Sequence, residues 1–183
     1  MPRVRWEDRL LALFDDLEQQ AEGLALADRD VEVAELSRAE YAGVDLASRL
    51  HASVGAAVTV RVQGLDRLDG VIERVGSDVL LLDARPHQWL VRVAALTGAA
   101  GLSGRARAES ARAVTARLGL GSALRELVRG GLPVLVCRVD GSRAEGLPRR
   151  VGADFLELTA TGDALGPTEL VPFSAICAVR PSS

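Results

Sequence analysis

The stretch RVGSDVLLLDA at residues 74–84 returns as RVGADFLELTA at residues 150–160, and this repeat governs the fold expected for the chain. Over positions 70–83, seven of the fourteen residues are identical to those 76 positions later. Farther along, WLVRVAALTG from Trp89 corresponds to ELVPFSAICA from Glu169 at an offset of 80, because the second copy has four more residues in one loop. The sequence therefore predicts a duplicated structural unit.

Alternating apolar residues predict short strands in each copy. Val58, Val60 and Val62 alternate with small or polar residues, which is the two-residue period of a strand with one buried face. Positions 80 and 82 hold leucine, as do their equivalents in the second copy, whereas Leu81 becomes Glu157. The face that carries positions 80 and 82 is therefore the expected core face, because a solvated face accepts such changes freely.

Glycine followed by a small polar residue separates the two strands of the repeated stretch. Gly76 and Ser77 fit a two-residue type II′ hairpin turn, because the first central position of that turn needs a positive φ angle. With such a turn, Val75 lies opposite Asp78. The second copy is expected to repeat this arrangement 76 residues later.

Each copy has the length of a small SH3-like or Sm-like barrel, with three or four short strands and a final one. The predicted fold class is α+β: an N-terminal helical arm, then two tandem small SH3-like or Sm-like β-barrels joined by a short helical connector. The expected division is an acidic helical arm at 1–55, a first barrel at 56–100, a loop and helical connector at 101–133, and a second barrel at 134–183. Because each barrel alone buries little surface, the two are expected to pair.

The first 55 residues have the pattern of amphipathic helix. From Trp6 to Leu24 apolar residues recur at spacings of three and four, and the pattern resumes from Val33 to Val54. Residues 1–55 carry 6 Arg and 12 acidic residues, whereas residues 101–133 carry 6 Arg and 2 acidic residues. The acidic arm and the basic connector attract each other or face different partners. The apolar stripe of the arm is expected to pack on the chain's own body or on a second copy.

The connector is expected to contain two short helices, at 109–118 and 122–129, around the glycines of LGLGSAL. These glycines fit a turn between helices, and an anion site at the second helix is the alternative. A helix-turn-helix reading of the same segment leaves Arg125 and Arg129 to meet DNA.

Cysteine usage and hydropathy limit the class of protein. Cys137 and Cys177 are the two cysteines, too few for a disulfide framework or a zinc site, and both are expected to be buried and reduced. No signal peptide pattern begins the sequence, and no stretch approaches the ~20 apolar residues of a membrane span. A cytoplasmic location without membrane binding is expected.

Residues suited to catalysis are sparse. His51 and His87 are expected at the surface, with no spacing that pairs either with an acid or a cysteine. Asp78 and Asp154 repeat, but they occupy equivalent places in different copies, as turn residues do. We therefore expect no enzymatic activity, no catalytic residues, no metal site, no cofactor and no small-molecule substrate.

Nucleic-acid binding is the alternative function. The stretch GVIERVGSDVLLL resembles the first half of an Sm-type fold, whose members often bind single-stranded RNA. This chain contains no Asn, has LTGAAG and ICAVRP where Sm-type folds typically have an Arg-Gly pair, and has only 3% aromatic residues for base stacking. The arginines that would contact RNA or DNA are Arg74, Arg105, Arg107, Arg112, Arg117, Arg149 and Arg150.

The whole layout resembles an uncharacterised actinobacterial family with a helical N-terminal arm and two Sm-like or SH3-like barrel repeats, sometimes labelled Fis-type regulators. The resemblance is carried by the acidic arm, the connector LGLGSALREL and the ending VPFSAICAVR. It covers nearly the full chain and implies no assigned activity. A Fis-type DNA reader ends in a basic recognition helix, whereas this chain is expected to end in strands.

The function expected from the sequence is a non-enzymatic interaction or adaptor module that binds a protein partner or a second copy of itself. Small barrels bind through loops and exposed strand edges. The loop near Trp89 and the loop TGDALGPT are the candidate contact regions. The predicted partner-binding residues are Trp89, Leu90, Gly166 and Pro167.

Overall fold

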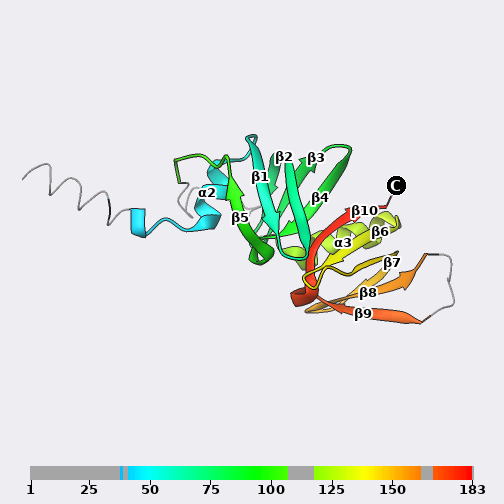
Figure 1. The fold of residues 1–183 in the computed structure, drawn as a ribbon. Helices are drawn as coiled ribbons and strands as arrows, with labels where there is room; N and C mark the ends of the chain where they lie inside the picture. Colours follow the sequence, from blue (N-terminus) through cyan, green and yellow to red (C-terminus); the bar gives the residue numbers. More distant parts are fainter. Residues whose placement is uncertain (1–37, 39–40, 107–117, 162–166, 183) are drawn as a thin grey trace, which may run out of the picture. The chain divides into compact units, whose positions relative to one another are not determined.

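A computed structural model of the chain describes residue 38 and residues 41–106, 118–161 and 167–182 (Figure 1). The chain divides into two compact units, Met1–Val44 and Asp45–Ser183. Every described strand belongs to the second unit. The predicted amphipathic helix at 6–24 and the predicted helix at 109–118 lie outside the described residues.

The second unit contains one structural pattern twice: a helix, four strands, a single 3-10 turn and a fifth strand. The first copy consists of α2 (Leu46–Ala52), β1 (Ala57–Val62), β2 (Leu65–Val75), β3 (Val79–Ala84), β4 (His87–Arg92), η1 (Val93–Ala95) and β5 (Leu96–Ala100). The second copy consists of α3 (Leu120–Gly130), β6 (Val134–Arg138), β7 (Arg143–Val151), β8 (Phe155–Ala160), β9 (Thr168–Pro172), η4 (Phe173–Ala175) and β10 (Ile176–Pro181).

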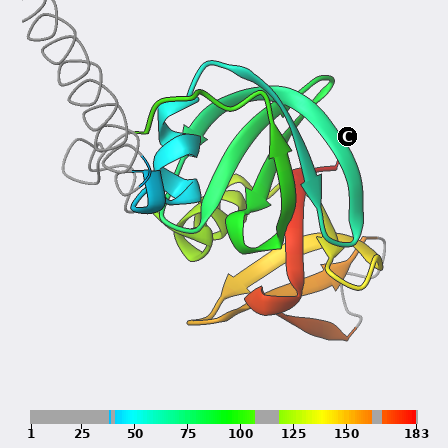
Figure 2. The same ribbon diagram turned by 60° about the vertical axis from the view of Figure 1, so that its left-hand side comes forward.

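The prediction of two separate closed barrels is wrong. The strands form one open antiparallel sheet of ten strands in the order β5-β1-β2-β3-β4-β10-β6-β7-β8-β9. Figure 2 shows the last strand, β10, running between strands of the first copy and strands of the second. Strand β10 pairs with β6 on one side and with β4 on the other. Because the backbone groups at a strand edge seek partners, the two copies complete each other's sheet instead of forming independent barrels.

The register of the strands confirms the duplication. Val58 pairs with Gly70 in the first copy, and the residues 76 positions later, Val134 and Gly146, pair in the second. Leu80 pairs with Val91, as Leu156 pairs with Val171. Both copies also shift register at the same point, between Ile72 and Arg74 and between Pro148 and Arg150. Residues 76 or 80 positions apart in the sequence therefore occupy equivalent places in the two copies.

The predicted two-residue hairpin turn is wrong by its register. Val75 pairs with Leu80, not with Asp78, and the Gly76 N–H donates to the Val79 carbonyl at 2.7 Å. The bond between Gly76 and Val79 centres the turn on Ser77 and Asp78, one residue later than predicted, and Gly76 does not have the positive φ of a type II′ turn. The turn also contacts the residues before α3: the Ser77 N–H donates to the Leu118 carbonyl at 3.2 Å.

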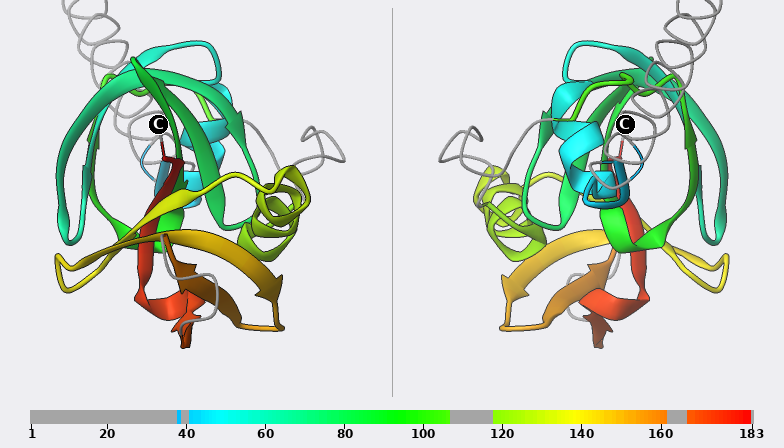
Figure 3. Two further views of the ribbon diagram at one scale, coloured as in Figure 1. Left: turned by 90° about the vertical axis from the view of Figure 1, so that its right-hand side faces the viewer. Right: turned by 90° about the vertical axis from the view of Figure 1, so that its left-hand side faces the viewer.

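The two hydrophobic cores lie on opposite faces of the continuous sheet. Leu80 and Leu82 are fully buried in the first core, which confirms the predicted core face. At the junction of the copies neighbouring residues alternate between cores: Ala178 is buried in the first and Val179 in the second. Strand alternation therefore lets one strand contribute to both cores. Figure 3 shows the strands of the two copies curving in different directions.

The two described α-helices belong to the repeats. Leu50 of α2 is buried in the first core, and Leu120 and Leu124 of α3 are buried in the second. The helix predicted at 122–129 is confirmed as the body of α3, which ends at Gly130 and is followed by Gly131 with a φ of 64°. The positive φ explains the glycine at this helix end. Each helix thus precedes five strands and packs with them as part of one repeat. The predicted boundaries instead assigned α2 to the helical arm and α3 to the connector.

Candidate interaction groove

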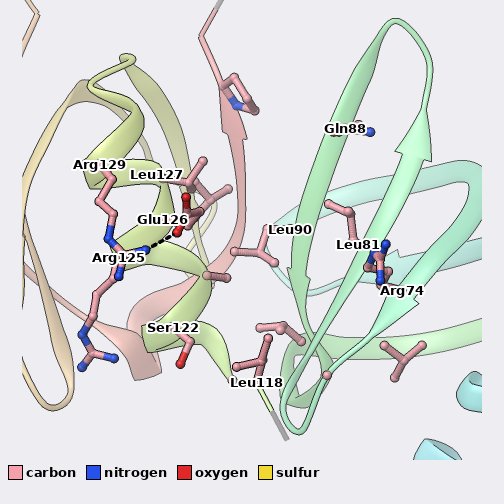
Figure 4. Close-up of a pocket in the computed structure, with 17 residues that line it drawn as sticks. Arg74, Leu81, Gln88, Leu90, Leu118, Ser122, Arg125, Glu126, Leu127 and Arg129 are labelled. Atoms are coloured by element: carbon pink, nitrogen blue, oxygen red, sulfur yellow. Dashed lines mark hydrogen bonds and ion pairs between the residues drawn. The ribbon is translucent and has the colours of Figure 1, made fainter. Parts of the chain in front are cut away.

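A groove of about 810 Å³ lies between α3 and the outer face of β2, β3 and β4, with β10 at its end (Figure 4). We call it the α3 groove. Its apolar floor is formed by Val79, Leu81, Leu90 and Leu127. Its polar rim is formed by Arg74, Arg125, Glu126 and Arg129. A groove with an apolar floor and a few polar groups has the usual composition of a binding site.

The floor arises where the outer face of the first copy stays apolar. Leu81 and Leu90 lie directly opposite each other on β3 and β4, so their side chains share one face. Leu90 and Leu127 are partly buried against the second core. Leu81 lies farther along the same face and is half-exposed. The groove is therefore the open margin of the second core, where apolar surface stays accessible.

The rim has an excess of positive charge. Arg74 reaches the groove from β2, opposite Leu81, and Arg125 and Arg129 come from α3. Arg129 forms an ion pair with Glu126 on the same helix, and both side chains are over two-thirds exposed, 72% and 71%. Such an exposed pair contributes little stability. Within the described residues, neither Arg74 nor Arg125 forms an ion pair.

Asp78 fixes one wall of the groove to the other. Its carboxylate accepts a hydrogen bond from the Leu120 N–H at 2.7 Å. The N-cap residue of α3, Gly119, has no side chain that can do this, so Asp78 supplies the capping oxygen from the β2–β3 hairpin. A Cβ added at Gly119 would lie 2.8 Å from Asp78 Oδ1. The sequence reading of Asp78 as a turn residue therefore missed its contact with the helix.

The structure describes three of the four predicted partner-binding residues and places them in different surroundings. Trp89 lies in β4, not in a loop, and is only 9% exposed within the first core. The Arg180 guanidinium stacks over its ring at 5.6 Å. Leu90 lines the α3 groove, and Pro167 is exposed just before β9. Gly166 lies outside the described residues.

The four described members of the predicted nucleic-acid-binding set lie on three different parts of the chain. Arg74 lies in the α3 groove, Arg105 follows β5, and Arg149 and Arg150 lie on β7. In the described residues no ion pair joins Arg74 to Asp78. Three predicted arginines lie outside the described part of the chain: Arg107, Arg112 and Arg117.

Leu81 and Leu127 are groove residues that sequence reasoning assigned to no site. A signal for Leu81 was present, because it is the position where the first copy has leucine and the second has Glu157. That difference was interpreted as freedom of a solvated face. In the structure Leu81 lines the α3 groove.

Among the described residues, the buried titratable side chains include two cysteines and a histidine. Cys137 and Cys177 are free and buried, as predicted. Burial raises the pKa of both thiols, that of Cys177 to about 11. His51, expected at the surface, is only 9% exposed because α2 packs on the first core. Over the described ranges, no three His, Cys, Asp or Glu side chains group as metal ligands do.

Comparisons with known proteins identify no relative. No protein-family model matches the chain, and no curated protein matches it. The structure's described helices include none that is long and apolar enough to span a membrane. The function is therefore argued from the groove and from the arrangement of the repeats.

Proposed function

We propose that this protein is a non-enzymatic, cytoplasmic interaction module whose α3 groove binds an acidic, amphipathic helical segment of a protein partner. The observation that carries the proposal is the combination of an apolar floor with a rim of three arginines and one glutamate. Amphipathic helices commonly bind in such grooves through apolar residues spaced three and four apart. The proposal requires no cofactor and no metal.

The apolar floor supplies the affinity. Leu81, Leu90 and Leu127 present side chains from two strands and a helix, so a partner helix touches them on one face. Each leucine-sized side chain that a partner buries contributes about 1.5–3 kcal/mol before the cost of association. Two or three such anchors match a groove of about 810 Å³.

The rim supplies the preference for acidic partners. Arg74 lines the groove from β2 and Arg125 lines it from α3, and Arg129 shares its charge with Glu126. A helix with carboxylates flanking its apolar stripe can reach these guanidinium groups while its stripe covers the floor. Complementary charge increases the association rate and selects among partners more than it adds affinity.

The second copy provides an internal comparison. Its equivalent outer face has Glu157 in place of Leu81 and Arg150 in place of Arg74. A glutamate on this face disfavours the same acidic, apolar segment by repulsion and by the cost of its desolvation. The proposal therefore assigns binding to the first copy's face alone.

The experiment is a fluorescence-anisotropy titration of the full chain with a labelled peptide that has leucines at helical spacing and glutamates elsewhere. We expect Leu81→Glu to weaken binding by at least about tenfold, because it places a carboxylate on the apolar floor. We expect the double variant Arg74→Ser/Arg125→Ser to weaken it by about threefold to tenfold at low salt. The matched control is Arg150→Ser, which changes the equivalent arginine of the second copy and should leave binding unchanged.

Three results oppose the proposal. A peptide with lysines in place of the glutamates that binds equally well shows that the rim does not select acidic partners. Equal loss with Arg150→Ser and with the Arg74/Arg125 double variant excludes the groove as the site. Tighter binding of a single-stranded oligonucleotide, lost with Arg74→Ser and with added salt, favours the nucleic-acid function instead. Unchanged urea midpoints of the variants confirm that each is folded.

A further inference from the structure

We propose that copies of this chain associate head to tail, with β9 of one copy pairing antiparallel to β5 of the next. The pairing extends the ten-stranded sheet from one molecule into another. This inference goes beyond the proposed function and does not depend on it, because the α3 groove lies on neither of these two strands. It rests on the junction that already joins the two repeats within one chain.

That junction is made by the fifth strand of one repeat and the fourth strand of the other. In β10, Ala178 pairs with Val91 of β4, and Val179 pairs with Leu90. Strand β10 makes these pairs while its other side pairs with β6 of its own repeat. The fifth strand of a repeat can therefore pair with one strand on each of its two sides.

The same two kinds of strand stand at the ends of the sheet. Strand β5 is the fifth strand of the first repeat, and among the described residues it pairs only with β1. Strand β9 is the fourth strand of the second repeat, and in the described part of the chain it pairs only with β8. At the offset of 80 residues, β5 is the equivalent of β10; likewise β9 is the equivalent of β4. The two end strands of the sheet, β5 and β9, are thus the equivalents of β10 and β4, the two strands that pair at the junction within the chain.

The equivalence of β5 with β10, and of β9 with β4, also gives the expected register between two molecules. Gly98 and Ala99 of β5 correspond to Ala178 and Val179. Val171 and Leu170 of β9 correspond to Val91 and Leu90. The intermolecular pairs are therefore Gly98 with Val171, and Ala99 with Leu170.

Side chains on both strands suit this contact. Leu170 is 59% exposed, whereas its equivalent Leu90 is partly buried against a core formed with the other repeat. Ala99 is partly buried against the first core, so pairing would cover Leu170 with the margin of the neighbour's first core. Gly98 projects no side chain, and the atom nearest to an added Cβ is the Arg61 Cδ at 3.8 Å. An exposed leucine on an edge strand with one free side is a recognised site of strand addition.

The contact is heterologous, because it joins two different surfaces of the same chain. One molecule contributes β9 and its neighbour contributes β5. The β5 strand of the first and the β9 strand of the second therefore stay free to pair with further molecules. Such contacts lead to a closed ring or to an open chain of copies, according to the rotation between neighbours.

The decisive experiment is disulfide trapping between two single variants of the full chain, Ala99→Cys and Leu170→Cys. Residues directly opposite on antiparallel strands have Cβ atoms about 4.5–5.5 Å apart, close to what a disulfide needs. We expect a covalent dimer when the two variants are mixed under mild oxidation, and little from either variant alone. Cys137 and Cys177 are buried and do not interfere.

A second experiment measures association without crosslinking. We expect the wild-type chain of 19.3 kDa to sediment as a species whose mass rises with concentration. Leu170→Lys should shift that equilibrium toward the monomer by about tenfold or more, because it places a charge on the edge strand. The control is Leu132→Lys, at a leucine that is equally exposed, 61%, but lies outside any strand.

Several outcomes overturn the inference. A wild-type chain that stays monomeric at the highest soluble concentration excludes it. Dimers of Leu170→Cys with itself would indicate pairing of two β9 strands instead. Association that survives Leu170→Lys, together with failure of the mixed variants to crosslink, would place the contact elsewhere in the chain. None of these results changes the expected binding of peptide to the α3 groove, so the two proposals fail separately.

Discussion

At the scale of single residues, Cys177 shows how the sheet junction controls chemistry. It lies in β10 where the register with β6 shifts between Ile176 and Ala178, and it is fully buried in the first core. Burial raises the pKa of its thiol from 9.0 to about 11, and the neighbouring Cys137 adds to the rise. The thiol therefore stays protonated and unreactive at neutral pH.

This pKa shift predicts a loss of stability in alkali. Between pH 9 and pH 11 the unfolded chain ionises at Cys177 while the folded chain does not, so the free energy of unfolding falls as pH rises through this range. Below pH 9 the contribution does not change. The sequence has no Lys and one Tyr, so few other groups titrate there. We expect Cys177→Ala to lose less stability than the wild type over this range, measured by urea unfolding at each pH. Parallel losses would contradict the assignment.

At the scale of elements, α3 is held in place by a residue from another element. Asp78 of the β2–β3 turn caps the helix at the Leu120 N–H, and Leu120 and Leu124 anchor the helix in the second core. Exposed N–H groups at a helix start need an acceptor, and a Gly N-cap cannot provide one from its own side chain. The groove wall and the hairpin of the other repeat therefore form one unit.

Asp78→Ala should destabilise the protein by about 0.5–2 kcal/mol, because the cap of α3 is lost. The matched control is Asp154→Ala in the second copy. Asp154 accepts a hydrogen bond from the Phe173 N–H through its backbone carbonyl, which the substitution retains. Urea unfolding of both variants is the measurement. Equal destabilisation by the two substitutions would show that the turn itself, and not the helix cap, needs the carboxylate.

At the scale of the whole folded unit, the turns of the two repeats touch each other. Gly64, in the β1–β2 turn, has a φ of 71°, and a Cβ there would lie 2.1 Å from the Arg138 carbonyl oxygen. Gly141, in the β6–β7 turn, has a φ of 86°, but an added Cβ would meet no atom closer than 3.8 Å. The two glycines share a left-handed backbone and differ in how closely the other repeat approaches.

Alanine at these two glycines separates backbone strain from contact between the repeats. We expect Gly141→Ala to cost about 1–2 kcal/mol, from strain alone. Gly64→Ala should cost more, because the added methyl group forces the two turns apart. Thermal unfolding of both variants, with the wild type, measures the difference. If Gly64→Ala is no more destabilising than Gly141→Ala, the close approach of the turns does not contribute to stability.

Local patterns were enough for part of this architecture. The alternation around Leu80 and Leu82 identified the core face, the offsets of 76 and 80 identified the repeat, and the helix predicted at 122–129 is the body of α3. The turn register and the site of Trp89 were predicted wrongly. In the structure the turn contacts Leu118 and the Trp89 ring contacts Arg180, and no local pattern contains contacts between residues so far apart in the sequence.

The sequence by itself determined that the chain duplicates one β-rich unit and which face of each strand is buried, because side-chain alternation and repeat identity are local properties of the chain. Only the tertiary structure decided that β10 joins the two copies into one sheet and that α3 and the outer face around Leu81 form a groove. The physical reason is that an edge strand's backbone groups accept any suitably placed partner. The identity of that partner is set by packing of whole elements and is not encoded in either strand alone.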